Sequence, residues 1–427
     1  MNCITRSLSR TIGIVALAWF VSSASLSADA TLTYGITYSV RPDAASRTLE
    51  VTLELVQDQA LLRRLSMQTD ERISAIEADG DLEFTESGPV WHPPAKGGTL
   101  RWQVAVDHRR NGDGYDAWFG EAWGLFRAED IIPRAATRTL KGAASQTQLS
   151  FDLPVNWSVA TQYYGRDARF QVANPERRFD QPTGWIILGN IGVRRERIAG
   201  TRVAVAAPVG QSVRRMDTLA LLNWTLPELA RLLPEPPARL TVFSAGDPMW
   251  RGGLSAPQSL FVHMDRPLIS ENATSTLLHE VMHLSLGITA EKNFDWIVEG
   301  LAEYYSLELL ARSGTISPAR YKAAQAGQRR WAATADRLCQ RMSVGATSAL
   351  AVARFADLDA EIREASEGKV SLDDVVRTLW QIDQRINLSI LTEATERIIG
   401  HKPDALHIDN LPGCRNIDND NEANREN

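Results

Sequence analysis

Two histidines spaced four residues apart, His279 and His283, frame the segment His-Glu-Val-Met-His, and Glu280 directly follows the first of them. On a helix, residues four apart lie on one face, so both imidazoles can reach a single cation. Glu280, one step round the helix, can then reach a water molecule on that cation. Two imidazoles with a carboxylate favour Zn²⁺, and the fourth position would be left to water. The pattern therefore predicts hydrolytic metal chemistry with Glu280 as the base.

A third ligand is available a short distance downstream. Residues 284–298 separate His283 from Glu299, which is enough chain for a turn and an antiparallel return to the metal. Glu303 lies one turn further on the same helical face, where it could hydrogen-bond the free ring nitrogen of a ligand histidine. The alternative is a chance pattern, in which the two histidines form a satisfied pair in the core.

Two helices are needed to position these residues. Leucine, valine and methionine side chains give residues 277–284 an apolar face, with Asn272 as a possible N-cap and Gly287 as a stop. The second segment repeats apolar residues at helical spacing from Ile297 to Leu310 and ends near Gly314. We expect these helices to pack side by side around the metal.

The motif residues resemble those of the gluzincin metallopeptidases. The closest likeness is to the M61 glycyl-aminopeptidase-like family, with the M1 aminopeptidases behind it. The resemblance covers most of residues 150–385 and is specific only around the metal. It is carried by HEVMH (279–283), WIVEGLAEYY (296–305), RSGTIS (312–317) and EGKVSLDDVVR (367–377), and more faintly by LPVNWSVAT (153–161) and GGL (252–254). It implies a zinc peptidase that binds a peptide or protein substrate.

The chain departs from this family at the oxyanion donor. The family usually supplies a tyrosine from a later helix, and alignment places Thr347 or Ser348 at that position. No tyrosine follows Tyr321. Substitute donors would have to come from elsewhere, and the candidates are Tyr305, Tyr304, Tyr321 and His263. For each of these four residues, the alternative to donating to the oxyanion is a purely structural role.

A second departure concerns the substrate. Aminopeptidases of this group carry a Gly-rich motif with a glutamate that pairs with the substrate's amino terminus. Here Gly252, Gly253 and Leu254 are followed by Ser-Ala-Pro-Gln, and the glutamate is missing. Without it a free amino group gains no charge-assisted contact. Endopeptidase activity, or a restricted substrate, becomes more plausible.

Alternating apolar and polar residues predict strands in the first part of the chain. Composition and helical periodicity predict that the last part is mostly helical. The predicted fold class is α+β multidomain, with an N-terminal β-sandwich-like domain, a thermolysin-like catalytic domain and a C-terminal helical domain. We expect a substrate-binding edge strand at residues 259–264, with an ordinary core strand as the alternative. The predicted boundaries are a signal peptide (1–30), the β-rich domain (31–160), the peptidase domain (161–317), the helical domain (318–409) and a polar tail (410–427).

The N-terminus is typical of a secretory signal. Arg6 and Arg10 precede an apolar run, and Ala-Asp-Ala at 28–30 fits a cleavage site. We expect an exported protein, periplasmic or secreted, with no transmembrane span after processing.

Two cysteines, Cys339 and Cys414, would remain after processing. In an exported chain they suggest one disulfide, and the alternative is two unpaired thiols.

Charge excludes one class of partner. Without residues 1–30 the chain would have 44 basic and 51 acidic side chains, so it is mildly acidic. Nucleic-acid binding needs a basic surface, and none is expected. The leading hypothesis is an exported zinc peptidase. The alternative is a non-catalytic zinc-containing relative that binds peptides or assists envelope assembly.

Overall fold

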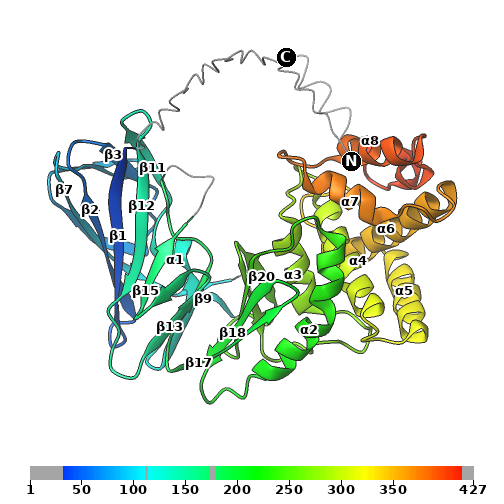
Figure 1. Ribbon diagram of the computed structural model, residues 1–427, viewed down its shortest axis with the longest axis horizontal. Coiled ribbons are helices and arrows are strands. Elements are labelled where there is room, and N and C mark those ends of the chain that lie inside the picture. The colour runs from blue at the N-terminus through cyan, green and yellow to red at the C-terminus, as the bar shows by residue number, and fades with distance from the viewer. Residues whose placement is uncertain (1–31, 111–113, 174–178, 416–427) are drawn as a thin grey trace, which may run out of the picture.

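The computed structural model describes residues 32–110, 114–173 and 179–415. The predicted signal peptide and the end of the polar tail lie outside these residues. No helix in the described part of the chain is long and apolar enough to span a membrane. Figure 1 shows three layers in chain order: β-sheets, a central sheet with helices, and a helical region.

The N-terminal region is a stack of antiparallel-rich sheets around one apolar core. Its largest sheet has strand order β14–β15–β12–β1–β2–β7–β4. Leu49, Val51, Leu53 and Leu55 alternate with polar residues and are buried, as the period-two pattern predicts. The strands are β14 (Tyr164–Arg166), β15 (Arg169–Val172), β12 (Ala144–Phe151), β1 (Thr33–Asp43), β2 (Thr48–Val56), β7 (Gly97–Ala105) and β4 (Ile73–Ala78).

Two smaller sheets pack against this one and complete the sandwich. The first is β11 (Ala135–Thr139), β3 (Leu62–Met67), β6 (Gly88–His92) and β5 (Asp81–Thr85). The second is β13 (Ser158–Thr161), β16 (Trp185–Gly189), β10 (Trp123–Arg127), β9 (Tyr115–Phe119) and β8 (His108–Arg109), with the short helix α1 (Ala128–Ile131) after β10. Strands up to Gly189 therefore belong to the N-terminal sheets, past the predicted boundary at 160.

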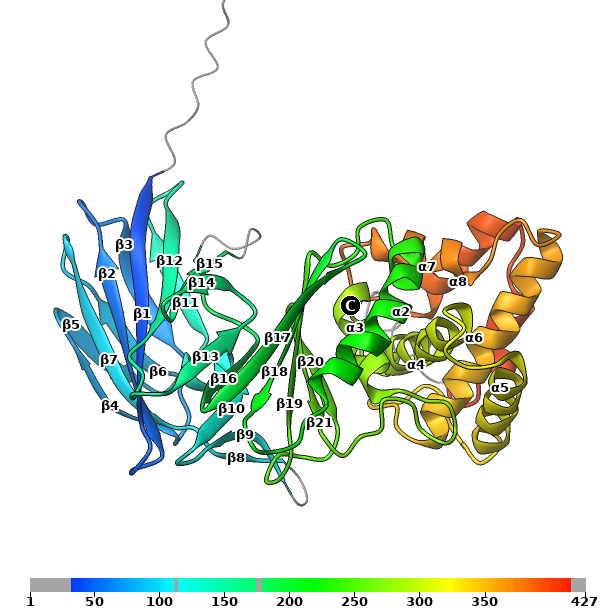
Figure 2. The same cartoon turned by 60° about the horizontal axis from the view of Figure 1, so that its bottom comes forward.

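A central sheet lies between the N-terminal region and the helices (Figure 2). Its strand order is β17 (Ile191–Ile198), β18 (Thr201–Pro208), β19 (Arg239–Ala245), β21 (Ser259–His263) and β20 (Gly253–Ala256). One face packs on helix α2 (Arg215–Leu232) and helix α3 (Thr276–Leu286). The other face packs on Trp185 and Leu125 of the N-terminal sheets.

The remaining helices form the C-terminal region. They are α4 (Asp295–Arg312), α5 (Pro318–Ala332), α6 (Ala346–Ala365), α7 (Leu372–Trp380) and α8 (Leu388–Ile399), followed by two 3₁₀ turns at Asp404–Leu406 and Ile408–Asn410. A disulfide joins Cys339, before α6, to Cys414, after the second 3₁₀ turn, with Cα atoms 5.0 Å apart, and this is the pairing that the sequence suggests.

The prediction that residues 259–264 form an edge strand is wrong. β21 lies between β19 and β20, and the edge of the central sheet is β20. The sequence around Gly253 has little apolar alternation, whereas β21 is buried along its whole length and is therefore the more conspicuous strand.

Candidate metal centre

Helix α3 presents the two histidines as the sequence predicts. The helix begins after Ser275, whose side chain accepts a hydrogen bond from the backbone amide of Leu278, so Ser275 is the N-cap and not Asn272. It ends at Gly287, which has φ of 60°, a left-handed conformation that glycine adopts without strain. Leu278, Val281 and Met282 are fully buried, which leaves His279 and His283 on the partly open face.

Helix α4 brings Glu299 and Glu303 back to the same place. It begins at Asp295, packs against α3, and passes very close to α6 at Gly300. A Cβ atom on Gly300 would lie 2.6 Å from the Cβ of Ala351, too close for any side chain there. The glycine lets α4 and α6 approach closely, so α4 packs against α6 as well as against α3.

Three side chains converge between the two helices. The Nε2 atoms of His279 and His283 are 3.0 Å apart. The carboxylate of Glu299 places one oxygen 3.4 Å from His279 Nε2 and the other 3.4 Å from His283 Nε2. Ligand atoms of the three residues all lie within 4.8 Å of one another, as a shared cation requires.

Glu303 contacts the ring nitrogen of His279 that faces away from the cluster. Its carboxylate is 3.1 Å from Nδ1 of His279, and this hydrogen bond needs a proton on Nδ1. The lone pair then stays on Nε2, the atom that faces His283 and Glu299. Carboxylates commonly orient metal-binding histidines in this way.

The charges of the cluster favour a cation. Burial by itself would lower the pKa of His279, but hydrogen bonds to Glu299 and Glu303 outweigh burial and raise that pKa to about 10. Burial would raise the pKa of Glu299, yet its hydrogen bonds to the two histidines lower it to about 2. Two carboxylates thus stabilise positive charge at the point where the ring nitrogens meet.

The donor set fits zinc. Bonds of about 2.0–2.2 Å at tetrahedral angles place neighbouring ligand atoms about 3.3 Å apart. The 3.0 Å between the two Nε2 atoms lies close to that value, and each Nε2 atom has a different oxygen of Glu299 at 3.4 Å. Two imidazoles and one carboxylate also form the ligand set of catalytic zinc sites that keep a position open for water.

Glu280 is placed beside the cluster and against the edge strand. Its side chain is buried, and burial raises the pKa of its carboxyl, an effect that the neighbouring His279 and His283 oppose. A Cβ atom on Gly253 of β20 would lie 2.9 Å from the Oε1 atom of Glu280. Glycine is therefore required for β20 to run next to this carboxylate. The Gly252-Gly253 pair is visible in the sequence and is the signal for this close approach, but its proximity to Glu280 is not.

The tyrosines considered as oxyanion donors have partners in the core. The hydroxyl of Tyr305 donates to Asp373 at 2.9 Å, and the whole side chain is buried. Tyr304 is buried and packs edge-on against the ring of Tyr305. Tyr321 donates its hydroxyl to Glu308. These contacts are those of structural residues.

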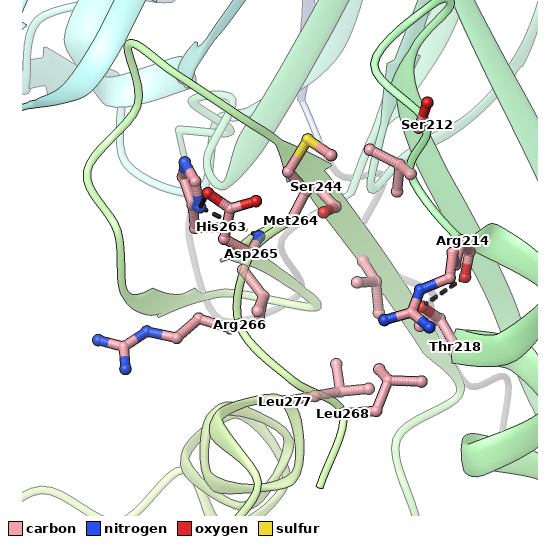
Figure 3. A pocket seen from close by; sticks show the side chains of 13 residues that line it. Ser212, Arg214, Thr218, Ser244, His263, Met264, Asp265, Arg266, Leu268 and Leu277 are labelled. Atoms are coloured by element: carbon pink, nitrogen blue, oxygen red, sulfur yellow. Dashed lines mark hydrogen bonds and ion pairs between the residues drawn. The ribbon is translucent and has the colours of Figure 1, made fainter. Parts of the chain in front are cut away.

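His263, the fourth candidate, lines a different cavity. This cavity, of about 350 Å³, includes Ser244 and Leu277, and Figure 3 shows His263 beside Asp265 at its rim. His263 Nδ1 accepts a hydrogen bond from the backbone amide of Asp265. Leu277 precedes His279 by two positions, about 200° round the helix, so the cavity lies on the far side of α3 from the metal cluster.

The residues aligned with the missing tyrosine hold the loop before α6. Ser348 donates its hydroxyl to the carbonyl of Ser343, and Thr347 accepts a hydrogen bond from Gln340. The Ser343 amide in turn donates to Asp295 at the start of α4. This loop, which has no distinctive sequence pattern, is thereby attached to the helix that carries Glu299.

This chain resembles known proteins in its fold, and the similar proteins are found among solved structures. No protein-family model matches the sequence, and no curated protein matches it. An aminopeptidase N family protein from Idiomarina loihiensis is similar at a TM-score of 0.60 and 16% identity, over 81% of this chain and 70% of that one. Leukotriene A4 hydrolase from Saccharomyces cerevisiae is similar at 0.52 and 14%, over 88% of this chain and 66% of that one. The same yeast enzyme in complex with bestatin gives 0.51 and 15%, over 90% and 68%.

The chain thus shares its fold with these proteins and spans about two thirds of their lengths. The multidomain α+β architecture expected from the sequence is confirmed. Membership of the M61 family in particular stays a prediction.

Proposed function

We propose that this protein is an exported zinc-dependent peptidase in which His279, His283 and Glu299 hold the metal. The observation that carries the proposal is the convergence of the three ligand groups at zinc-like separations, with the Glu280 carboxylate beside them. The fold shared with aminopeptidase N supports a peptidase, although at 16% identity the likeness concerns the fold.

Glu280 is the proposed general base. Bound zinc would supply an acidified water molecule and polarise the scissile carbonyl. Glu280 would take the proton from this water and pass it to the departing amine. Burial raises the pKa of its carboxyl, which improves its ability to hold a proton between these two steps.

The edge strand β20 is the proposed backbone partner of the substrate. An edge strand offers unpaired amides and carbonyls, and an extended peptide can pair with them. Because Gly253 lies next to Glu280, a peptide along β20 would place a bond near the base. The missing glutamate after Gly253 removes the partner of a free amino terminus, so we infer cleavage of internal bonds or of a restricted substrate class.

The test is the product profile of a mixed peptide library. The zinc-loaded wild type should cleave it, and a chelator should stop cleavage. Glu280→Gln should retain one zinc per chain while turnover falls by about a thousandfold or more, since the base is lost. Glu271→Gln, on the exposed loop before the same helix, is the matched control and should behave as wild type. Full activity of Glu280→Gln would refute the assignment.

A non-catalytic peptide-binding or envelope-assembly role is the second candidate. It is favoured by the absence of the family's tyrosine, since Thr347 and Ser348 hydrogen-bond within the protein instead. The intact Glu280 argues against it, because a structural site needs no base and normally closes its fourth position. Saturable peptide binding by the zinc-loaded protein without any product would decide for this role.

Export is proposed from the N-terminal sequence and agrees with the Cys339–Cys414 disulfide, which persists in oxidising compartments. Expression with residues 1–30 intact, followed by cell fractionation and N-terminal sequencing, tests it. The mature chain should begin at residue 31 outside the cytoplasm. A chain that stays in the cytoplasm with Met1 in place would contradict export.

A further inference from the structure

Three arginines form a row across neighbouring strands of the central sheet. Arg197 of β17 is paired in register with Arg202 of β18, and Arg202 is paired with Arg239 of β19. Residues directly opposite one another in a sheet point to the same face, about 5 Å apart. Like charges placed in this way destabilise a sheet unless something of opposite charge offsets them.

The row lies on the face that meets the N-terminal region. Four residues along each strand, the equivalent row is Val193, Ala206 and Phe243, and it packs against the N-terminal sheets. The same face therefore changes from an apolar interface to a row of cations. Figure 2 shows β17 and β18 beside β13 and β16 of the N-terminal region.

A cavity of about 410 Å³ opens at this point between the two regions. Four arginines line it, Arg195 in addition to the row, whereas Glu196 is the one acidic residue among its described lining residues. Strand alternation directs the Glu196 side chain to the opposite face from Arg195 and Arg197. Within the described residues, no carboxylate forms an ion pair with any of the four arginines. This concentration of positive charge stands out in a chain with a net charge of −6.

Two of the guanidinium groups are held in place by the N-terminal region. Those of Arg202 and Arg239 lie 4.3 and 3.8 Å from the ring centroid of Tyr164, on β14. Arg239 also donates a hydrogen bond to the backbone carbonyl of Gln162. Stacking on an aromatic face fixes a guanidinium while leaving its N–H groups free at the edge. These two cations are thus ordered in advance of any ligand.

We propose that this cavity, the arginine pocket, binds a ligand through its phosphate groups. Arginine pairs bidentately with phosphate and carboxylate. A phosphate offers three oxygens and close to two negative charges, which suits three adjacent guanidinium groups better than a single carboxylate does. The phosphate could belong to a soluble metabolite or to the headgroup of an anionic lipid. The pocket is separate from the metal cluster, which lies beyond the other face of the central sheet.

Calorimetric titration with pyrophosphate tests the proposal on the full chain. Wild type should bind saturably, and a chelator should not alter this binding. Arg202→Gln removes the central cation of the row and should weaken binding by about tenfold or more. Arg194→Gln removes the same charge from β17, the strand that carries Arg197, but on the other face of the sheet, and should change the affinity by less than about twofold. Absence of saturable binding, or equal losses in both variants, overturns the proposal.

Two further measurements keep the outcome decisive. If Arg202→Gln does not fold, Arg197→Gln at the end of the row replaces it, with the same expected direction. In buffer without multivalent anions Arg202→Gln should unfold at a higher temperature than wild type, because one repulsive centre is gone, and pyrophosphate should raise the unfolding temperature of wild type more. Citrate is the carboxylate probe, and tighter binding of citrate than of pyrophosphate refutes the phosphate assignment.

The two sources of phosphate are separated with vesicles. Phosphatidylcholine vesicles with phosphatidylglycerol should retain wild type and lose Arg202→Gln if the ligand is a lipid headgroup, and plain phosphatidylcholine vesicles should retain neither. Binding of pyrophosphate with no retention on either vesicle supports a soluble phosphate ligand.

Discussion

Helix α4 carries two polar clusters whose chemistry differs. At its C-terminal end Arg312 pairs with both oxygens of Asp373, at 2.8 and 3.0 Å, and Tyr305 donates to the same carboxylate. Every charge there has an opposite partner within the protein. Near its N-terminal end Glu299 faces the Nε2 atoms of His279 and His283, and Glu303 faces Nδ1 of His279. The first set is closed and stabilises the fold. The second set groups three side chains that could hold a metal ion, as proposed above.

The largest expected effect comes from removing one of the three proposed metal ligands. Glu299→Ala should lower zinc affinity by more than a hundredfold and abolish peptide cleavage, because one of three ligands is lost. Competition with a chromogenic chelator measures the affinity. Glu308→Gln, on the same helix but in the closed cluster, should leave zinc affinity unchanged. Equal zinc affinity in wild type and Glu299→Ala would show that α4 contributes no ligand.

A substitution in the closed cluster of Arg312, Asp373 and Tyr305 should lower stability and leave zinc affinity unchanged. Asp373→Asn leaves Arg312 without its bidentate partner, and we expect a loss of about 2 kcal/mol in the free energy of unfolding, less than for a fully buried pair because both side chains are partly exposed. Urea unfolding measures the loss. Zinc affinity of the folded variant should equal that of wild type. A large fall in zinc affinity would mean that the two clusters are coupled along α4.

The contrast also shows what the sequence could predict. The four-residue spacing of His279 and His283 and the reach to Glu299 follow from helix geometry alone, and the structure brings these groups together. Burial of alternate residues in β2 follows in the same way from strand geometry. Such local patterns depend on the period of one element and need no knowledge of the rest of the fold.

Features that depend on the packing of distant segments could not be predicted. The partner of Tyr305 is Asp373, 68 residues away, so its hydroxyl could be proposed as an oxyanion donor until the contact was known. The edge position of β20 depends on the order of five strands, which the pattern in β21 does not encode. The arginine row needs the register of three strands and was invisible in a chain of negative net charge.

A smaller effect on zinc affinity is expected at Glu303, which contacts the ligand His279. Glu303→Gln keeps the size of the side chain and removes the charge that orients His279, so zinc affinity should fall by about tenfold without loss of the fold. The same competition assay measures it, and Glu393→Gln at an exposed position of α8 is the charge control. If Glu303→Gln binds zinc as tightly as wild type, the 3.1 Å contact with His279 does not contribute to metal binding.

The smallest effect is the pH dependence of the closed cluster. Burial would raise the pKa of Asp373, but the hydrogen bond and charge of Arg312 outweigh burial and lower it. A carboxyl whose pKa is lower in the folded state stabilises the protein above its unfolded pKa, near 4, and this contribution is lost as the pH falls through the folded pKa. The free energy of unfolding of wild type should therefore fall more steeply below about pH 4 than that of Asp373→Asn, and the gap between them should narrow with acid. Urea titrations at pH 7, 5, 4 and 3 measure this gap. A gap that stays constant over the series would show that Asp373 keeps its charge throughout, or that its removal acts through packing.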